Sequence, residues 1–282
     1  MTVRAKATAG VYTNTGDCVY VLNPTAQKAF EDTGGSFTLG CGIEVNSNAA
    51  NAMNTTAHNA MTMNNGAGIK VHGLWSDSTS ADCCTFNGGG SVMQNQPSFS
   101  DPISGLTAPV PAGGCTPDPM VAGLHAALDP GTYCSISTSN TGGGINALML
   151  NPGVYIMKTG NFKISGGIVN ASGVTLYFPT TGGAMDVSGG TFNLTAPVGG
   201  STDGIAIWEA GTTGGKVTGG GTSITGLIYM PQAHLDYTGG GSGAETIVVD
   251  TLKVTGGSIG GASSSNYYSN GHTATGVYLL PN

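Results

Sequence analysis

The sequence predicts an all-β fold, a right-handed parallel β-helix (β-solenoid), and three observations support this prediction. Glycine is unusually frequent, with 49 among 282 residues, whereas only 8% of residues are charged. The hydrophobic residues, 39% of the chain, fall in short runs separated by glycine pairs. Two such units recur along the second half, and recurrence at intervals of about 20 to 50 residues is typical of stacked architectures. Glycine suits their corners because it adopts positive φ without steric cost.

The recurrence is clearest in residues 136–282, which we expect to form the regular part of the solenoid. One unit is a glycine followed by a β-rich apolar run, and it begins at Gly153, Gly173, Gly204, Gly226 and Gly276. A second unit interleaves with the first and ends in Gly-Gly. Its copies are Ile164-Ser-Gly-Gly, Val187-Ser-Gly-Gly, Val217-Thr-Gly-Gly and Val254-Thr-Gly-Gly.

The first half carries weaker forms of the same signals. Residues 17–74 are predicted to be less regular coils, and we expect one continuous domain over 17–282. Residues 75–135 are rich in Ser, Gly, Pro, Asp and Cys and lack periodicity, so we interpret them as a disulfide-pinned loop excursion. Residues 1–16 are interpreted as a leader.

One or two short helices interrupt the predicted strands. Pro119 suits the first position of a helix, and the spacing of Met120, Leu124 and Leu128 gives that helix an apolar face over 119–128. A second helix, over residues 24–31 and capped by Asn23, is an alternative to a turn.

The six cysteines predict disulfides and an exported protein, because their number is even and no Cys-x-x-Cys spacing typical of zinc sites occurs. Of the fifteen pairings that six cysteines allow, we favour Cys18–Cys41, with Cys83 or Cys84 joined to Cys115 or Cys134. We therefore predict an extracytoplasmic location, in the periplasm or at the cell surface.

The charge composition excludes some partners. The net charge is −7 and Arg4 is the single arginine, so no basic patch is available for nucleic acid or for an anionic membrane surface. We predict no contact of this segment with nucleic acid or membrane.

Catalysis is also disfavoured by the sequence. Ser201-Thr-Asp-Gly-Ile205 resembles a strand of polygalacturonases, but glycan cleavage needs further carboxylates nearby and a cation for the uronate. Gly240-Gly-Ser-Gly-Ala-Glu245 approximates one calcium-binding nonapeptide, and such sites need tandem copies. We predict no enzyme, no catalytic residues, no metal site and no cofactor, with calcium as an alternative.

Four motifs in series resemble the TadG-like proteins of the Flp/Tad pilus assembly system. They are Cys18-Val-Tyr-Val-Leu-Asn-Pro24 with Cys41-Gly-Ile-Glu-Val-Asn-Ser47, Asp101-Pro-Ile-Ser-Gly-Leu-Thr-Ala-Pro109, Leu150-Asn-Pro-Gly-Val-Tyr-Ile156 and Gly226-Leu-Ile-Tyr-Met-Pro-Gln-Ala233. The resemblance covers nearly the whole chain. It implies an N-terminal transmembrane anchor, absent here, an extracytoplasmic domain without an active site, and a role in assembling or tethering pili with pilus or envelope proteins as partners.

Aromatic residues supply the candidate binding surface. An aromatic recurs near the same point of each coil, either as a stack inside or along the solenoid or as an exposed ladder for a partner protein or surface glycan. The residues are Tyr155, Tyr177, Trp208, Tyr229 and Tyr278.

The leading hypothesis is thus a non-catalytic structural or attachment module of a Tad-type pilus or another surface assembly. A carbohydrate- or ice-binding adhesin is the first alternative, and a uronan lyase or hydrolase is the second. Ice binding needs outward threonines at matching positions of successive coils, and we expect Thr175, Thr195, Thr218 and Thr255 not to share one position.

Overall fold

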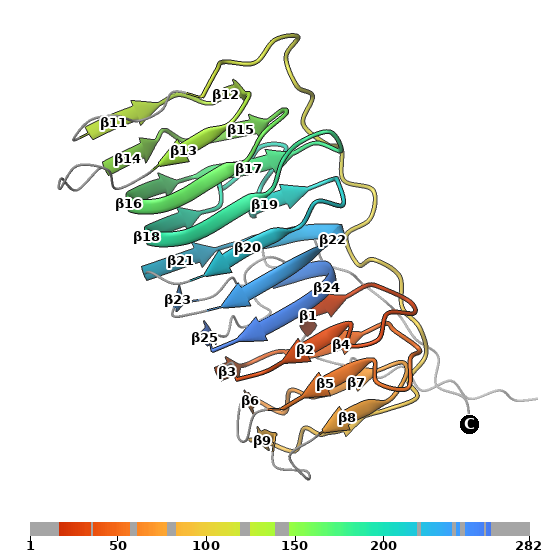
Figure 1. Ribbon diagram of the computed structural model, residues 1–282. Helices are drawn as coiled ribbons and strands as arrows, with labels where there is room; N and C mark the ends of the chain where they lie inside the picture. The colour runs from red at the N-terminus through yellow and green to blue at the C-terminus, as the bar shows by residue number, and fades with distance from the viewer. Residues whose placement is uncertain are drawn as a thin grey trace, which may run out of the picture.

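The computed structural model of the chain confirms the β-solenoid, with parallel strands stacked in about nine turns (Figure 1). It describes residues 17–34, 36–56, 61–77, 83–118, 125–138, 147–218, 221–238, 241–242, 246–256 and 258–260. All regular elements within these residues are strands. The same residues hold no helix that is long and apolar enough to cross a membrane.

Each turn of the solenoid has three sides. The first side stacks β12 (Gly131–Tyr133), β15 (Gly153–Met157), β17 (Val174–Phe178), β19 (Ile205–Glu209), the first halves of β22 (Leu227–Thr238) and β24 (Thr246–Thr255), β1 (Asp17–Val21), β4 (Gly42–Val45), β7 (Ile69–Val71) and β10 (Val92–Met93). The second side stacks β13 (Ile136–Thr138), the first halves of β16 (Phe162–Ser172) and β18 (Met185–Thr195), β20 (Gly215–Thr218), the second halves of β22 and β24, β2 (Phe30–Asp32), β5 (Met53–Thr55) and β8 (Trp75–Asp77). The third side holds β11 (His125–Leu128), β14 (Ala147–Leu150), the second halves of β16 and β18, β21 (Gly221–Thr225), β23 (Gly241–Ser242), β25 (Ser258–Gly260), β3 (Ser36–Leu39), β6 (Met61–Met63) and β9 (Cys84–Phe86).

The core consists of columns of inward side chains, one residue from each turn. Alternate residues of each strand point inward, so strands in register place similar residues above one another. Burying these side chains stabilises the stack because each removes apolar area from water. The column of the first side contains Tyr155, Leu176, Ile207, Ile228, Ile247, Val19, Ile43, Ile69 and Val92.

The spatial order of the turns differs from their order in the sequence. The first described strand, β1, lies near the middle of the stack, and the chain runs from it through β10 to one end. Residues 94–115, here called the strap, then run along the outside to the opposite end, from which β11–β25 return (Figure 1). There β24 pairs with β1 and β2, and β25 pairs with β3. Strands from distant parts of the chain thus complete one turn, which we call the seam.

Glycines form the corners that the sequence predicted. Gly173 and Gly204, each the first residue of an apolar unit, have φ of 69° and 71°. Gly167 and Gly190, the last residues of two Gly-Gly units, have φ of 82° and 80°. A side chain is strained at such angles, so these corners require glycine.

Neither predicted helix forms in the described residues. Residues 119–124 lie outside them, but His125–Leu128 form β11, which pairs in register with β14, so the prediction of helix over 119–128 is wrong there. Pairing with the neighbouring turn outweighs the helix propensity of Ala and Leu. The predicted helix over residues 24–31 is also wrong. Residues 24–29 form a turn capped by Asn23, whose Oδ1 accepts hydrogen bonds from the backbone N–H groups of Thr25 and Ala26, and residues 30–31 belong to β2.

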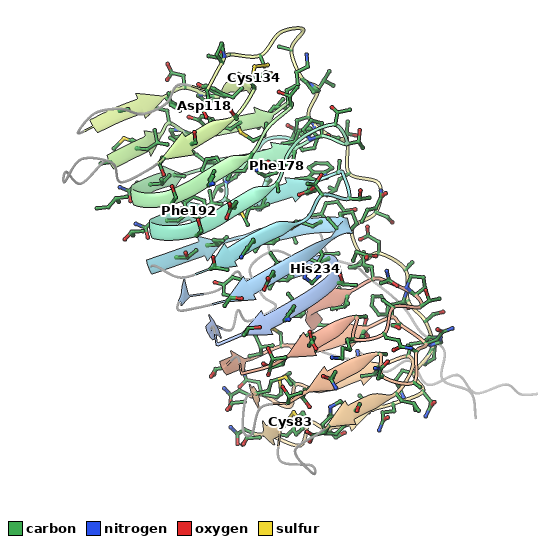
Figure 2. The ribbon with its side chains drawn as sticks, viewed as in Figure 1. Cys83, Asp118, Cys134, Phe178, Phe192 and His234 are labelled. Atoms are coloured by element: carbon green, nitrogen blue, oxygen red, sulfur yellow. A yellow bond between two sulfur atoms is a disulfide. The ribbon has the colours of Figure 1, made fainter. Side chains whose placement is uncertain are left out.

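Three disulfides are present, as expected of an oxidising, extracytoplasmic compartment. Cys18–Cys41 is confirmed. The predicted joining of Cys83 or Cys84 to Cys115 or Cys134 is wrong, because Cys83 pairs with Cys84 and Cys115 with Cys134. The strap separates the two pairs: Cys83 lies near one end of the stack and Cys134 near the other (Figure 2).

Candidate functional site

Three of the five predicted aromatic residues lie on the outer face of the first side, where the strap covers them. Tyr177, Trp208 and Tyr229 form one outward column, with ring centroids 5.5 and 5.7 Å apart, and each is at most 6% exposed. Phe99, Ile103 and Leu106 of the strap pack against this group.

A hydrogen bond fixes the strap over this column, because the Tyr229 hydroxyl donates to Asp101 Oδ2 at 2.6 Å.

The other two predicted aromatic residues are not part of this column. Tyr155 points into the core instead, and its hydroxyl donates to the carbonyls of Leu128 and Asn151. Tyr278 lies outside the described residues. The arrangement is therefore a covered stack and not an exposed ladder.

The second side carries an outward column of alternating charge. Its six members come from six successive turns and follow one another in strict register across the seam. We call this the charge column: Lys163, Asp186, Lys216, Asp236, Lys253 and Glu31. Opposite charges on neighbouring strands contribute about 0.2–1 kcal/mol per pair, so the alternation stabilises the register of the stack.

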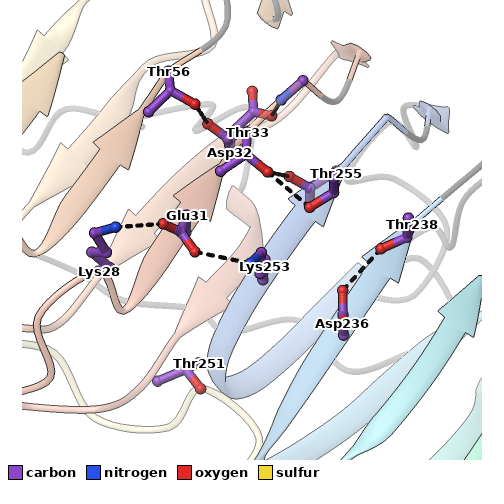
Figure 3. Close-up of polar contacts among 12 residues, drawn as sticks. Lys28, Glu31, Asp32, Thr33, Thr56, Asp236, Thr238, Thr251, Lys253 and Thr255 are labelled. Atoms are coloured by element: carbon purple, nitrogen blue, oxygen red, sulfur yellow. Dashed lines mark hydrogen bonds and ion pairs between the residues drawn. The ribbon is translucent and has the colours of Figure 1, made fainter. Parts of the chain in front are cut away.

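A column of threonines runs beside the charge column and is part of the same face (Figure 3). Thr218, Thr238 and Thr255 are in register, and Thr33 and Thr56 continue the column beyond the seam. Adjacent members are about 4.8 Å apart, the spacing of neighbouring strands. The charge column and this threonine column together are called the charged face.

Hydrogen bonds hold the side chains of the charged face in place (Figure 3). Thr33 Oγ1 and Thr255 Oγ1 are 2.8 Å apart across the seam, and Thr238 Oγ1 donates to Asp236 Oδ1 at 3.0 Å. Lys28 Nζ lies 2.7 Å from Glu31 Oε1, and Lys253 Nζ lies 3.4 Å from Glu31 Oε2. The hydrogen bond from Lys28 is the main cause that lowers the pKa of Glu31.

The four threonines do not share one position, as expected, although Thr218 and Thr255 occupy the same column. Thr195 lies on the third side, and Thr175 is buried and donates a hydrogen bond to the Ile205 carbonyl at 2.7 Å.

Histidine borders the charged face at one point. His234 Nδ1 lies 2.8 Å from Thr251 Oγ1. The two residues are paired in register on the neighbouring strands β22 and β24. Burial is the main cause that lowers the pKa of His234, so this imidazole favours its neutral form.

The third side carries no charged residue in β14, in the second halves of β16 and β18, or in β21. Asn170 and Asn193 stack in one outward column, with Asn193 Nδ2 donating to Asn170 Oδ1 at 2.9 Å. A shallow depression of about 270 Å³ beside this column is lined by Met149, Asn151 and Thr195, among others. It offers amides, hydroxyls and one exposed thioether, but no acid–base pair.

The motifs that suggested other chemistry have local structural roles. Asp203, in the motif that resembles polygalacturonases, caps a turn through a hydrogen bond from the Gly199 N–H at 2.7 Å. The calcium-like segment 240–245 lies largely outside the described residues. The described part of the chain holds no group of three or more His, Cys, Asp or Glu side chains that could bind a metal ion.

A signal for the charged face exists in the sequence. In each copy of the second unit, the Gly-Gly pair is preceded by Ser or Thr, then by an apolar residue, and before that by a charged residue, as in Lys163-Ile-Ser-Gly-Gly. Two further copies, Asp236-Tyr-Thr-Gly-Gly and Glu31-Asp-Thr-Gly-Gly, belong to the same series. Extending the unit by one residue reveals six charges, although their alternation emerges only when the copy at Glu31 is placed after the copy at Lys253.

Comparison of this chain with protein-family models, with curated proteins and with solved structures finds no match.

Proposed function

We propose that this chain is a non-catalytic, extracytoplasmic structural module that attaches to another component of a surface assembly through its charged face. One observation carries the proposal: two parallel columns of polar side chains continue in register across turns from both halves of the chain. The resemblance to TadG-like proteins suggests pilus or envelope proteins as the partners.

The physical character of the face favours attachment. Its backbone is held by strand pairing on both sides of nearly every turn, so ordering of the backbone costs little entropy on binding. The column holds three positive and three negative groups, so a partner is recognised by the order of charges and not by net charge.

The test compares two variants that disturb the same number of turns. Lys216→Ser with Asp236→Ser removes one neighbouring pair from the charge column and leaves the net charge unchanged. Asn170→Ser with Asn193→Ser removes one neighbouring pair from the third side and serves as the matched control. The three proteins are immobilised and offered purified pilus subunits and envelope proteins from the same cell.

We expect the wild type and the control to retain a pilus or envelope protein, and the variant of the charged face to retain at least tenfold less, because a lost pair of well-placed contacts costs more than about 1.4 kcal/mol. Retention of no component by the wild type contradicts attachment. Equal retention by both variants removes the charged face from the proposal.

Ice binding is a second candidate, and the threonine column favours it. Five hydroxyls at a regular spacing of about 4.8 Å form the kind of repetitive surface that a crystal lattice can match. The adjacent charge column opposes this function because charged groups hold their own hydration water. A measured thermal hysteresis that disappears in Thr238→Lys supports ice binding, and its absence in the wild type excludes it.

A further inference from the structure

A lysine and two carboxylates from three successive turns meet on the first side, below the aromatic column. Lys70 Nζ on β7 lies 2.6 Å from Asp17 Oδ2 on β1 and 2.8 Å from Glu44 Oε1 on β4. Glu44 and Lys70 continue the outward column of Tyr20 in strict register. Three reactive groups thus occupy one place in the fold although Asp17 and Lys70 are 53 residues apart.

The fold makes room for this cluster. The register of β1 on β4 shifts between Asp17 and Val19, so Asp17 lies opposite Gly42. A Cβ at position 42 would lie 1.8 Å from Asp17 Oδ1, so the carboxyl group of Asp17 fills the space that glycine leaves. The side chains of Asp17, Glu44 and Lys70 are 8%, 19% and 30% exposed.

The start of the strap shields the cluster from one direction. A cavity of about 250 Å³ is lined by Glu44, Lys70 and His72 together with Pro97 and Phe99 of the strap. The amine and the Asp17 carboxyl are therefore held in contact at a site with restricted access to water.

The shifted pKa values of the cluster favour the ion pair above about pH 6. Burial is the main cause that raises the pKa of Asp17 to about 6; the Glu44 charge adds to the rise, while Lys70 opposes it. Burial also acts to lower the pKa of Lys70, but its hydrogen bonds to Asp17 and Glu44 outweigh burial and raise that pKa. Moving one proton from Nζ to Asp17 converts the ion pair into a neutral amine and a carboxylic acid without changing the total charge.

We propose that Lys70 and Asp17 condense to an intramolecular amide, with Glu44 as the group that carries the proton. In the neutral pair, the Nζ lone pair attacks Cγ of Asp17 and forms the N–C bond. Glu44 takes a proton from Nζ and delivers it to the departing hydroxyl, so the C–O bond breaks and one water leaves. The step is a dehydration, so it needs neither an oxidant nor a cofactor.

The 2.6 Å contact between Lys70 Nζ and Asp17 Oδ2 places the amine beside the carboxyl carbon that bears this oxygen. A nucleophile and its target react efficiently when the protein holds them in a near-attack geometry of about 3–3.5 Å, because the entropy of approach has already been lost on folding. A carboxylate in hydrogen-bond contact with the amine is the positioned base that proton transfer requires.

The amide would add a covalent link in a direction that the disulfides do not cover. Cys18–Cys41 joins β1 to the residue before β4, whereas the amide joins β1 directly to β7, one turn further along the stack. Unlike the disulfides, it would survive a reducing agent.

The intact mass of the full chain, measured after reduction and denaturation, tests this inference. We expect the wild type to be lighter than its sequence by one water. We also expect no tryptic cleavage after Lys70, and a peptide containing Asp17 joined to one containing Lys70.

Two variants separate the amide from an ordinary ion pair. Lys70→Arg keeps the cation beside Asp17 but cannot form the amide. Its measured mass should therefore equal the mass calculated from its own sequence, while its fold is retained. Glu44→Gln keeps both reacting groups and should lose at least tenfold in the rate of dehydration. A folded wild type that keeps its full mass after prolonged incubation on both sides of the Asp17 pKa overturns the proposal. Dehydration at an undiminished rate in Glu44→Gln overturns the role of Glu44.

Discussion

Glu209 occupies a position in the core that its neighbours in the column fill with apolar side chains. It follows Phe178 in register, and it is 1% exposed. Its Oε1 accepts hydrogen bonds from the backbone N–H groups of Thr213 and Gly214 at 3.1 and 3.3 Å, whereas Oε2 has no partner among the described residues. Burial raises the pKa of Glu209 from 4.5 to about 7.

This raised pKa predicts a stability that falls as pH rises. The folded state binds a proton at Glu209 more tightly than the unfolded state does. The resulting contribution to the free energy of unfolding is fully present below about pH 4.5 and is lost as pH rises to about 7. The pKa shift of Glu209 corresponds to about 3 kcal/mol of this free energy. Glu209→Gln should abolish this part of the pH dependence. Urea unfolding of both proteins at several pH values measures it, and parallel curves for the two proteins would contradict the prediction.

Tyr237 and Tyr155 allow a comparison of two buried hydroxyls. The Tyr237 hydroxyl has no hydrogen-bond partner among the described residues, whereas that of Tyr155 donates to two carbonyls, at 2.6 and 2.9 Å. An unsatisfied buried polar group costs about 1–3 kcal/mol, and a satisfied one contributes about 1 kcal/mol. Tyr237→Phe should therefore leave the free energy of unfolding unchanged or raise it by about 1 kcal/mol.

Tyr155→Phe is the matched control for that substitution, and it should lower the free energy of unfolding by about 1 kcal/mol because two carbonyls lose a donor. Thermal and urea denaturation of the two variants measure the sign of the change in the free energy of unfolding for each. Destabilisation of Tyr237→Phe by as much as Tyr155→Phe would show that the Tyr237 hydroxyl has a partner in solution.

At the scale of elements, the strap acts as a lid over the aromatic column. Leu106 is one of the strap residues that pack on the group around Trp208, whereas Val110, further along the strap, is 85% exposed. Leu106→Asp places a charge in an apolar contact, so we expect the strap to detach locally and Trp208 to become accessible to water.

Fluorescence quenching by acrylamide measures this change. The experiment is done in a Trp75→Phe background, so that Trp208 is the single tryptophan and is excited selectively over the tyrosines. Val110→Asp is the control, and it should leave the quenching unchanged. Equal quenching of all three proteins would mean that Leu106 does not hold the strap in place.

The elements were partly predictable from the sequence. Gly153, Gly173, Gly204 and Gly226 begin apolar units and carry the positive φ required at corners, and this local requirement is visible in the residues themselves. The strand at His125–Leu128 was not predictable, because its Ala and Leu residues favour a helix and only pairing with β14 decides against it. The cover over Tyr177, Trp208 and Tyr229 was equally hidden, since Asp101 and Tyr229 are 128 residues apart.

The order of the turns is a property of the whole molecule, and no local pattern encodes it. Every turn offers the same kind of strand edge, so the sequence does not reveal that β24 docks on β1. The charged face depends on this order, because Lys253 and Glu31 become neighbours only at the seam. This is why the sequence predicted the solenoid but missed its most regular surface.

The seam predicts that the chain tolerates a break in the strap. Gly113 and Gly114 are exposed, and a Cβ at either position would meet nothing within 4 Å. No disulfide crosses this point, because Cys18–Cys41 and Cys83–Cys84 precede it and Cys115–Cys134 follows it. After cleavage there, we expect the two fragments to remain associated through β24, β1 and β2.

Gel filtration of the nicked protein checks this expectation. The fragments should elute together in native buffer and separate only in denaturant. Separation in native buffer would show that the pairing at the seam is too weak to hold the two halves without the covalent connection.

The seam also determines when the molecule is completed during synthesis. Asn23 and Asp250, which meet there through side-chain hydrogen bonds, are 227 residues apart, so the turn that contains Asn23 is synthesised long before the segment it pairs with. Contacts between such distant residues form slowly. Until they form, the edge of β1 is unpaired and able to associate with other nascent chains. Export before folding would make β1 and β24 available at the same time, and a turn synthesised early would then be among the last to close.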